Sequence, residues 1–216
     1  MKLLLPYIFV FIIIFNMILR RSSTKQEART KAFWDKERKA NETRKQDISL
    51  LNYITIPDNL PQLNKGDTQL DLLVEDNPAL KRRFEEIENL KTKKILNLSA
   101  ISNTDLKMEY GAANLTELSE YDDNYTTLVK DLATIGHEMI NFGFTSKALA
   151  FLEYGIKIGT DIKSNYYDLA GIYINENADD KLDGLLKNAE NLDSINKDVI
   201  IDQLSEMIYS RKIILN

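Results

Sequence analysis

The fold is decided by residues 129–162, which read VKDLATIGHEMINFGFTSKALAFLEYGIKIGTDI, and by residues 163–196, which read KSNYYDLAGIYINENADDKLDGLLKNAENLDSIN. Apolar or small residues occupy the same seven positions in each 34-residue stretch. These core positions are Leu132, Ile135, Gly136, Met139, Ala148, Leu152 and Gly155 in the first stretch, and Tyr166, Leu169, Ala170, Tyr173, Leu182, Leu186 and Ala189 in the second. Spacings of three and four residues are typical of the apolar faces of amphipathic helices. The sequence therefore predicts two helix–turn–helix units, with turns at residues 141–145 and 175–178.

This spacing resembles the tetratricopeptide repeat, a family whose 34-residue unit is a helix–turn–helix. The resemblance covers residues 129–196, and a further helix over residues 197–212 is expected to cap the stack. Three features depart from the family pattern: its fourth-position Trp is absent, Leu182 is large for its position, and Thr160 and Ser194 replace the usual Pro. The alternative is a pair of ordinary helical hairpins without a shared repeat.

The resemblance also implies an interaction surface, because in that family the first helix of each pair lines a concave groove. The corresponding residues here are Lys130, Ala133, His137, Ile140, Asn141, Ser164, Tyr167, Gly171 and Ile174. The family's cationic clamp for C-terminal carboxylates is not reproduced, since Lys130 is the only Lys or Arg among them and Ala133 stands where a clamp lysine is usual. The expected ligand is therefore an apolar or extended segment of a protein partner.

The N-terminal residues 3–19 read LLLPYIFVFIIIFNMIL and contain no charged residue. As a helix this segment is roughly 25 Å long, close to the lower limit for crossing a bilayer. A cleaved signal peptide is the alternative, but Arg20 and Arg21 follow at once, without the small residues of a cleavage site. The sequence predicts a single transmembrane anchor over residues 1–21.

Basic residues predict the orientation of this anchor. Only Lys2 precedes the apolar segment, whereas Arg20, Arg21, Lys25 and Arg29 follow it closely. Positive charge collects on the cytoplasmic side of membrane segments. We therefore expect a single-pass protein of the cell membrane with its C-terminal part in the cytoplasm.

Charge divides the rest of the chain into a basic collar and an acidic body. Residues 20–46 hold ten Lys or Arg and four Asp or Glu, a net charge of +6, whereas residues 47–216 have a net charge of −12. We expect a juxtamembrane helix over residues 22–47 that meets anionic lipid headgroups. Phe33 and Trp34 within it have two interpretations: they contact the membrane interface or a partner, or they fold back on the domain. Nucleic acid is not an expected partner, because the body is acidic.

The remaining elements complete an all-α prediction, which few Gly and Pro residues favour. Residues 48–76 are expected to form an extended connector, with a short strand at 53–56. The helical domain then covers residues 77–216, starting with a helix over 79–97 that Asn77 caps and Pro78 begins. A short helix is predicted from Ser102 to Gly111. Two segments, residues 33–57 and 94–125, resemble pieces of uncharacterised single-anchor bacterial proteins, a likeness that concerns architecture alone.

Motifs for catalysis are missing from the sequence. The chain has no Cys, and His137 is its only His. His137-Glu138 begins like H-E-x-x-H, but Asn141 occupies the position of the second zinc ligand. We therefore predict no catalytic residue, no metal site and no cofactor, and interpret the chain as a membrane-anchored scaffold or adaptor. The alternatives are a structural subunit of a membrane or envelope-assembly complex, and an enzyme built from carboxylates alone.

Overall fold

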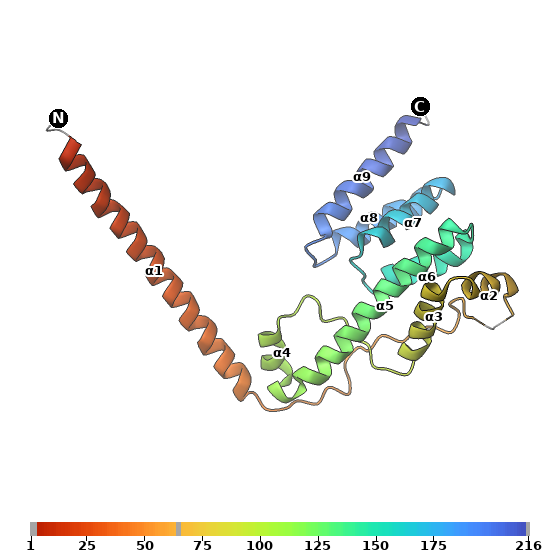
Figure 1. Cartoon of the computed structure of the whole chain (residues 1–216), viewed down its shortest axis with the longest axis horizontal. Coiled ribbons are helices and arrows are strands. Elements are labelled where there is room, and N and C mark those ends of the chain that lie inside the picture. Colours follow the sequence, from red (N-terminus) through yellow and green to blue (C-terminus); the bar gives the residue numbers. More distant parts are fainter. Residues whose placement is uncertain (1–3, 64–65, 215–216) are drawn as a thin grey trace. The chain divides into compact units, whose positions relative to one another are not determined.

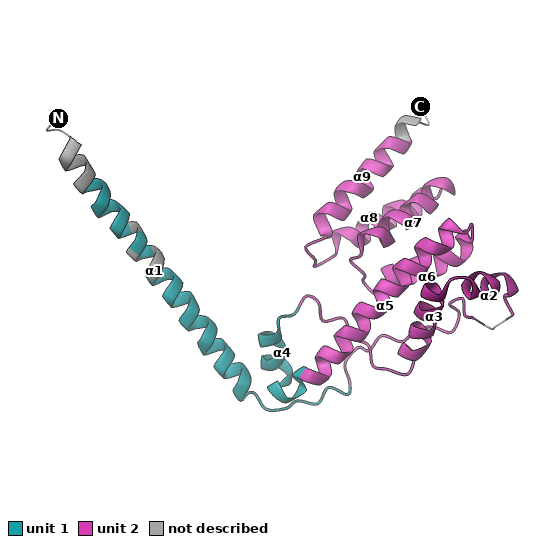
Figure 2. Cartoon of the chain, in the orientation of Figure 1, with its two compact units in different colours: residues 1–49, 101–115 teal, residues 50–100, 116–216 magenta. Residues whose placement is uncertain are grey.

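The computed structural model describes residues 4–63 and 66–214, and over these residues the chain is all-helical, as predicted. Its helices, labelled in Figure 1, are α1 (Leu4–Glu42), α2 (Thr68–Glu75), α3 (Pro78–Leu90), α4 (Asn103–Tyr110), the short 3-10 helix η1 (Ala112–Asn114), α5 (Leu115–Asn141), α6 (Thr145–Lys157), α7 (Lys163–Asn175), α8 (Asp179–Glu190) and α9 (Lys197–Ile214). They belong to two compact units, coloured in Figure 2. Unit 1 consists of Met1–Ser49 and Ile101–Leu115, and unit 2 of Leu50–Ala100 and Thr116–Asn216.

The N-terminal part of unit 1 is one continuous helix, α1. The predicted anchor and the predicted juxtamembrane helix are therefore not separate elements, and the helix ends at Glu42 rather than at residue 47. Of the predicted anchor, residues 1–3 and the side chains of residues 4–9, 18 and 20 lie outside the part of the chain that is described. Among the helices of the described residues, none is both long enough and apolar enough to be assigned as a membrane span.

Charged side chains hold α4 against the C-terminal part of α1. The Lys36 ammonium lies 2.6 Å from the Asp105 carboxylate, and the Thr104 hydroxyl donates a 2.7 Å hydrogen bond to Glu37. Lys107 forms an ion pair with the same Glu37 carboxylate, which holds the pKa of Glu37 below its usual value. Ala40, fully buried, follows these contacts along α1. Residues 36–40 of α1 thus have a fixed partner in α4.

The start of unit 2 departs from the predicted connector. Residues 68–75 form α2 instead of an extended chain, because the Asp67 side chain caps the helix by accepting a hydrogen bond from the Leu70 N–H. The strand predicted at residues 53–56 is wrong, and the Ile54 N–H donates a single 2.9 Å bond to the carbonyl of Ile95. Helix α3 ends at Leu90 rather than at residue 97, and it is followed by turns in which the Thr92 and Lys93 N–H groups donate to the carbonyls of Asn89 and Leu90.

The start of α3 agrees with the prediction. Asn77 is the N-cap and accepts a hydrogen bond from the Leu80 N–H at 3.1 Å, and Pro78 is the first helical residue. Because Pro lacks an N–H, this position costs the helix no hydrogen bond. The short α4 also lies within its predicted range and is capped by Ser102.

The C-terminal helices stack in sequence order and keep the period seen in the sequence. Thr145 and Asp179, which begin α6 and α8, stand at equivalent positions of the repeat, and so do Lys163 and Lys197, which begin α7 and α9. Helix α7 packs against α6, α8 and α9, and α8 also packs against α9, so that the helices lie side by side in Figure 1. Of the fourteen core positions identified from the sequence, all are buried except Leu186, which is half-buried and packs against the core.

Two glycines permit the closest approaches between these helices. A Cβ atom on Gly136 would lie 2.6 Å from the Leu152 side chain, and one on Gly155 would lie 2.7 Å from the Asn165 side-chain oxygen. Asn165 is fully buried and donates a 3.0 Å hydrogen bond to the Leu152 carbonyl, so it is not free to move away. Helix α6 therefore lies against α5 and α7 at distances that only glycine allows.

An ion pair joins α3 to α5. The Arg83 guanidinium lies 2.6 Å from one oxygen of Asp131, whose side chain is only 4% exposed. The other Asp131 oxygen has no hydrogen-bond partner among the described residues. Burial raises the pKa of Asp131, and Arg83 opposes this effect by stabilising the charged form. Arg83 therefore offsets part of the cost of burying this carboxylate.

We predict that Arg83→Met destabilises the fold by roughly 3 kcal/mol at pH 7, because a buried charge loses its partner. A carboxyl whose folded-state pKa is raised loses stability as pH rises, so the deficit should shrink as pH falls toward about 4. Urea denaturation at several pH values measures this. The double variant Arg83→Met/Asp131→Asn, which removes both charges, should recover most of the loss. A deficit that does not change with pH would contradict the account.

Candidate functional site

The residues predicted to line a groove lie on the first helices of the two hairpins, α5 and α7. Most are accessible: Lys130, His137, Asn141 and Ser164 are exposed, and Ile140, Tyr167, Gly171 and Ile174 are half-buried. The prediction is wrong for Ala133, which is only 3% exposed and belongs to the packed interior. Five cavities found among the described residues have other linings. We therefore call this surface the first-helix face, defined as the accessible sides of α5, α7 and α9.

A polar contact brings the α5 and α7 parts of this face together. The His137 ring nitrogen Nδ1 lies 2.9 Å from a carboxylate oxygen of Asp168. His137 is about half exposed, whereas the Asp168 side chain is mostly covered. Asp168 was not among the residues predicted from the sequence. It follows Tyr167 directly, but only the packing of α7 beside α5 shows that it faces His137.

An apolar stripe is the most regular feature of the first-helix face. Ile140, Ile174 and Ile208 stand at equivalent positions of α5, α7 and α9, each separated from the next by one repeat period, and all three are half-buried. Tyr209, which follows Ile208, is 67% exposed. The sequence interpretation treated α9 only as a cap and so missed Ile208 and Tyr209. The signal was present, because extending the repeat by one period from Ile174 leads to Ile208.

Tyr167 has a structural role on this face. Its hydroxyl donates a 3.4 Å hydrogen bond to the carbonyl of Val199 at the start of α9, and its burial raises the pKa of the phenol. The ring is therefore committed to the packing of α7 against α9. A substitution at Tyr167 would disturb this packing as well as any ligand contact.

Gly171 is the opposite case. It lies on α7 in the middle of the first-helix face, and a Cβ atom added there would have no neighbouring atom within 4 Å. The face is thus open at this point. A larger side chain at Gly171 would occupy space above the face without displacing anything in the core.

Acidic residues dominate the α9 end of the face. Asp198, Asp202 and Glu206 are exposed along α9, whereas Lys130 is exposed on α5. The first-helix face thus combines half-buried apolar side chains with exposed charged ones. Within the described residues, no group of three His, Cys, Asp or Glu side chains is placed to hold a metal ion.

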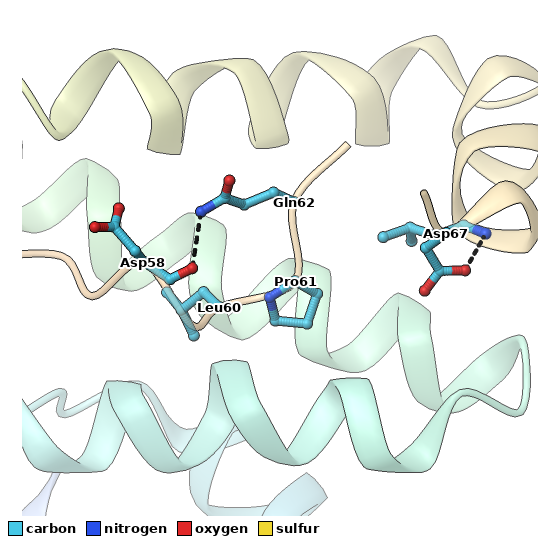
Figure 3. A pocket seen from close by; sticks show the side chains of 6 residues that line it. Asp58, Leu60, Pro61, Gln62 and Asp67 are labelled. Atoms are coloured by element: carbon cyan, nitrogen blue, oxygen red, sulfur yellow. Dashed lines mark hydrogen bonds between the residues drawn. The ribbon is translucent and has the colours of Figure 1, made fainter. Parts of the chain in front are cut away.

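The cavities elsewhere are formed by loop and hairpin packing. The cavity in Figure 3 has a volume of about 620 Å³ and is lined by residues of the loop before α2, with Leu70 of α2. Its polar groups already have partners: Gln62 donates to the carbonyl of Asp58 at 3.1 Å, and Asp67 caps α2 and pairs with Lys147 at 2.8 Å. These groups stabilise the loop and leave no convergent set of polar atoms for a ligand among the residues described there.

Comparison with known proteins gives no relative from which a function could be carried over. No protein-family model, no curated protein and no solved structure matches the chain. Function must therefore be inferred from the residues themselves.

We predict opposite effects of substitution at Gly171, on the first-helix face, and at Gly155, in the core. Gly171→Leu should leave stability unchanged or raise it by up to about 1 kcal/mol, because the site is open and glycine is a poor helix residue. Gly155→Ala should destabilise by roughly 1–3 kcal/mol, because the added methyl group meets the fixed Asn165 side chain. Urea denaturation of both variants measures the difference. Equal effects would contradict the described packing.

Proposed function

We propose that this chain is a membrane-anchored interaction module whose first-helix face binds a protein or peptide partner. The observation that carries the proposal is the apolar stripe of Ile140, Ile174 and Ile208, which is half-buried on three helices of one stack. Covering each of these side chains contributes on the order of 1 kcal/mol. Three such contacts contribute about 3 kcal/mol in all, so a specific partner must also contact other residues of the first-helix face.

The 34-residue period of the stack supports a tetratricopeptide-like assignment of residues 129–196, with α9 as the capping helix. Close approach at Gly136 and Gly155 agrees with the small residues that the family places at these positions. In such arrays the first helices form the binding surface. A partner that lies across α5, α7 and α9 would contact one isoleucine on each helix.

The proposed anchor is supported by the uncharged segment over residues 3–19 and by the basic residues that follow it. On this basis we place the protein in the cell membrane as a single-pass protein, with unit 2 in the cytoplasm. Lipid headgroups are then the partners of the basic residues nearest the membrane, such as Arg21 and Lys25.

The second candidate, a structural subunit of a membrane complex, would be favoured by an exposed apolar patch on α3. Its apolar residues Leu80, Phe84, Ile87 and Leu90 are instead buried in the core of unit 2. This burial favours the first-helix face as the surface that meets a partner.

We predict that substitutions on the first-helix face abolish partner recovery in an affinity pull-down of the detergent-solubilised protein. Gly171→Leu is the sharpest variant, since it blocks the face without touching the core, and Ile140→Asp places a charge on the stripe. Gly184→Leu is the matched control, because Gly184 on α8 is equally open. We expect recovery to fall at least about tenfold for the first two and to be unchanged for the control. Undiminished recovery with Gly171→Leu would refute the proposal.

Topology gives an independent prediction. A reporter that is active only outside the cytoplasm, fused after Asn216, should give no signal, because the basic residues after the anchor keep the body inside. The same reporter fused before Met1 serves as the positive control. Activity of the C-terminal fusion would show that the proposed orientation is wrong.

A further inference from the structure

Two aromatic side chains of α1 form an exposed pair in unit 1. Phe33 is 52% exposed and Trp34 is 59% exposed, and their rings meet edge to face with centroids 5.3 Å apart. A contiguous exposed apolar surface can mark a site of interaction, and here the two rings form one. The sequence leaves open whether this pair contacts the membrane or a partner, and the helix that holds it decides between the two.

The continuity of α1 sets the distance of this pair from the bilayer. Trp34 follows Leu19, the end of the proposed anchor, on the same helix, which is unbroken from Leu4 to Glu42. At about 1.5 Å per residue, Trp34 lies roughly 22 Å along the helix from the hydrocarbon edge. The headgroup layer is only about 5–8 Å thick, and the usual tilt of about 20° hardly shortens the distance. A spanning α1 therefore holds the pair clear of lipid.

The surroundings of the pair favour an acidic partner. Residues 20–46 have a net charge of +6. On the C-terminal side of the pair the charges are matched within unit 1, since Asp35 pairs with Arg38 at 2.6 Å, Glu37 pairs with Lys107, and Lys36 pairs with Asp105 at 2.6 Å. Lys31, on the N-terminal side of Phe33, is exposed. An apolar surface with basic residues around it is complementary to an apolar surface with acidic residues around it.

A second copy of this chain does not meet that requirement. Two copies anchored in the same membrane place the same basic segment at the same height, and like charges at close range repel each other. The occupant must differ in charge from residues 20–46 and must reach α1 some distance above the membrane, roughly 20 Å along the helix.

We propose that Phe33 and Trp34 form a docking surface for an acidic, amphipathic segment of a protein partner. This inference rests on the proposed anchoring but is separate from the first-helix face. The partner segment covers the two rings with its apolar side and pairs its carboxylates with exposed basic residues on the N-terminal side of the pair, such as Arg29 and Lys31. Helix α4 contacts residues 36–40 of α1. Phe33 and Trp34 precede these residues and therefore lie nearer to the proposed anchor.

Trp34 is the only tryptophan in the chain, so its fluorescence reports on this surface alone. The test uses the full chain in vesicles of phosphatidylcholine and phosphatidylglycerol. The probe is a synthetic helical peptide with leucines on one face and glutamates on the other, and the matched control carries lysines in place of the glutamates. We expect the glutamate peptide to shift the Trp34 emission to shorter wavelength, with binding that weakens at high salt. Phe33→Ser should weaken it about tenfold, with an unchanged circular dichroism spectrum.

Several results would overturn the proposal. Quenching of Trp34 by brominated lipid in the absence of peptide would place the pair in the bilayer. An equal shift of the Trp34 emission with the lysine peptide, or no shift with the glutamate peptide, would show that the surface does not select an acidic partner. Loss of peptide binding in Gly171→Leu would assign the peptide to the first-helix face. Flotation with the vesicles tests the anchor separately, and a chain that fails to float contradicts the anchoring together with this inference.

Discussion

The close approach of α6 to its two neighbours is the constraint on which the stack in unit 2 depends. Gly136 leaves room for the Leu152 side chain and Gly155 leaves room for the Asn165 side chain, and the buried Asn165 donates a hydrogen bond to the Leu152 carbonyl. Helices that approach this closely have few alternative registers. The same contact fixes which side of α7 is buried and which side remains on the first-helix face. The exposure of the first-helix face is thus a consequence of interior packing.

Unit 1 is organised mainly by polar contacts. Its long helix α1 is held at the C-terminal end by Lys36, Glu37 and their partners on α4. Apolar burial among its described residues is confined to Ala40, Ile48 and Leu106. Acidic and basic side chains that are partly exposed contribute modestly to stability. Unit 1 therefore has a single long helix whose aromatic pair remains available, whereas unit 2 has the extensive core.

The helical period and the capping residues could be read from the sequence, whereas the ends of several elements could not. The repeated apolar positions identified the buried residues of α5 to α8, and Asn77-Pro78 identified the start of α3, because helix period and capping are local properties. The bounds of other elements did not follow from the apolar pattern: α3 ends at Leu90 rather than at residue 97, and α2 forms where Asp67 caps it. For the site, Ile140 and Ile174 were expected on the face because of the resemblance to the tetratricopeptide repeat.

The accessibility of individual site residues could not be predicted in this way. The burial of Ala133 and the pairing of His137 with Asp168 depended on how α7 packs beside α5. Tyr167 was expected to be a ligand contact, and its bond to Val199 gives it a structural role in addition. The resemblance to a repeat family indicated which face of the molecule to consider. Only the packing in the structure distinguished the accessible residues on that face from the covered ones.

The central claim is that the first-helix face meets a protein partner. Photo-crosslinking in intact cells tests it most directly, with p-benzoylphenylalanine placed at Gly171 or, in a separate variant, at Gly184. Both glycines offer open space for the added side chain, one on α7 within the face and the other on α8 outside it. We predict a discrete crosslinked adduct from position 171 and none from position 184. An adduct from position 184 alone, or none from either position, would contradict the account.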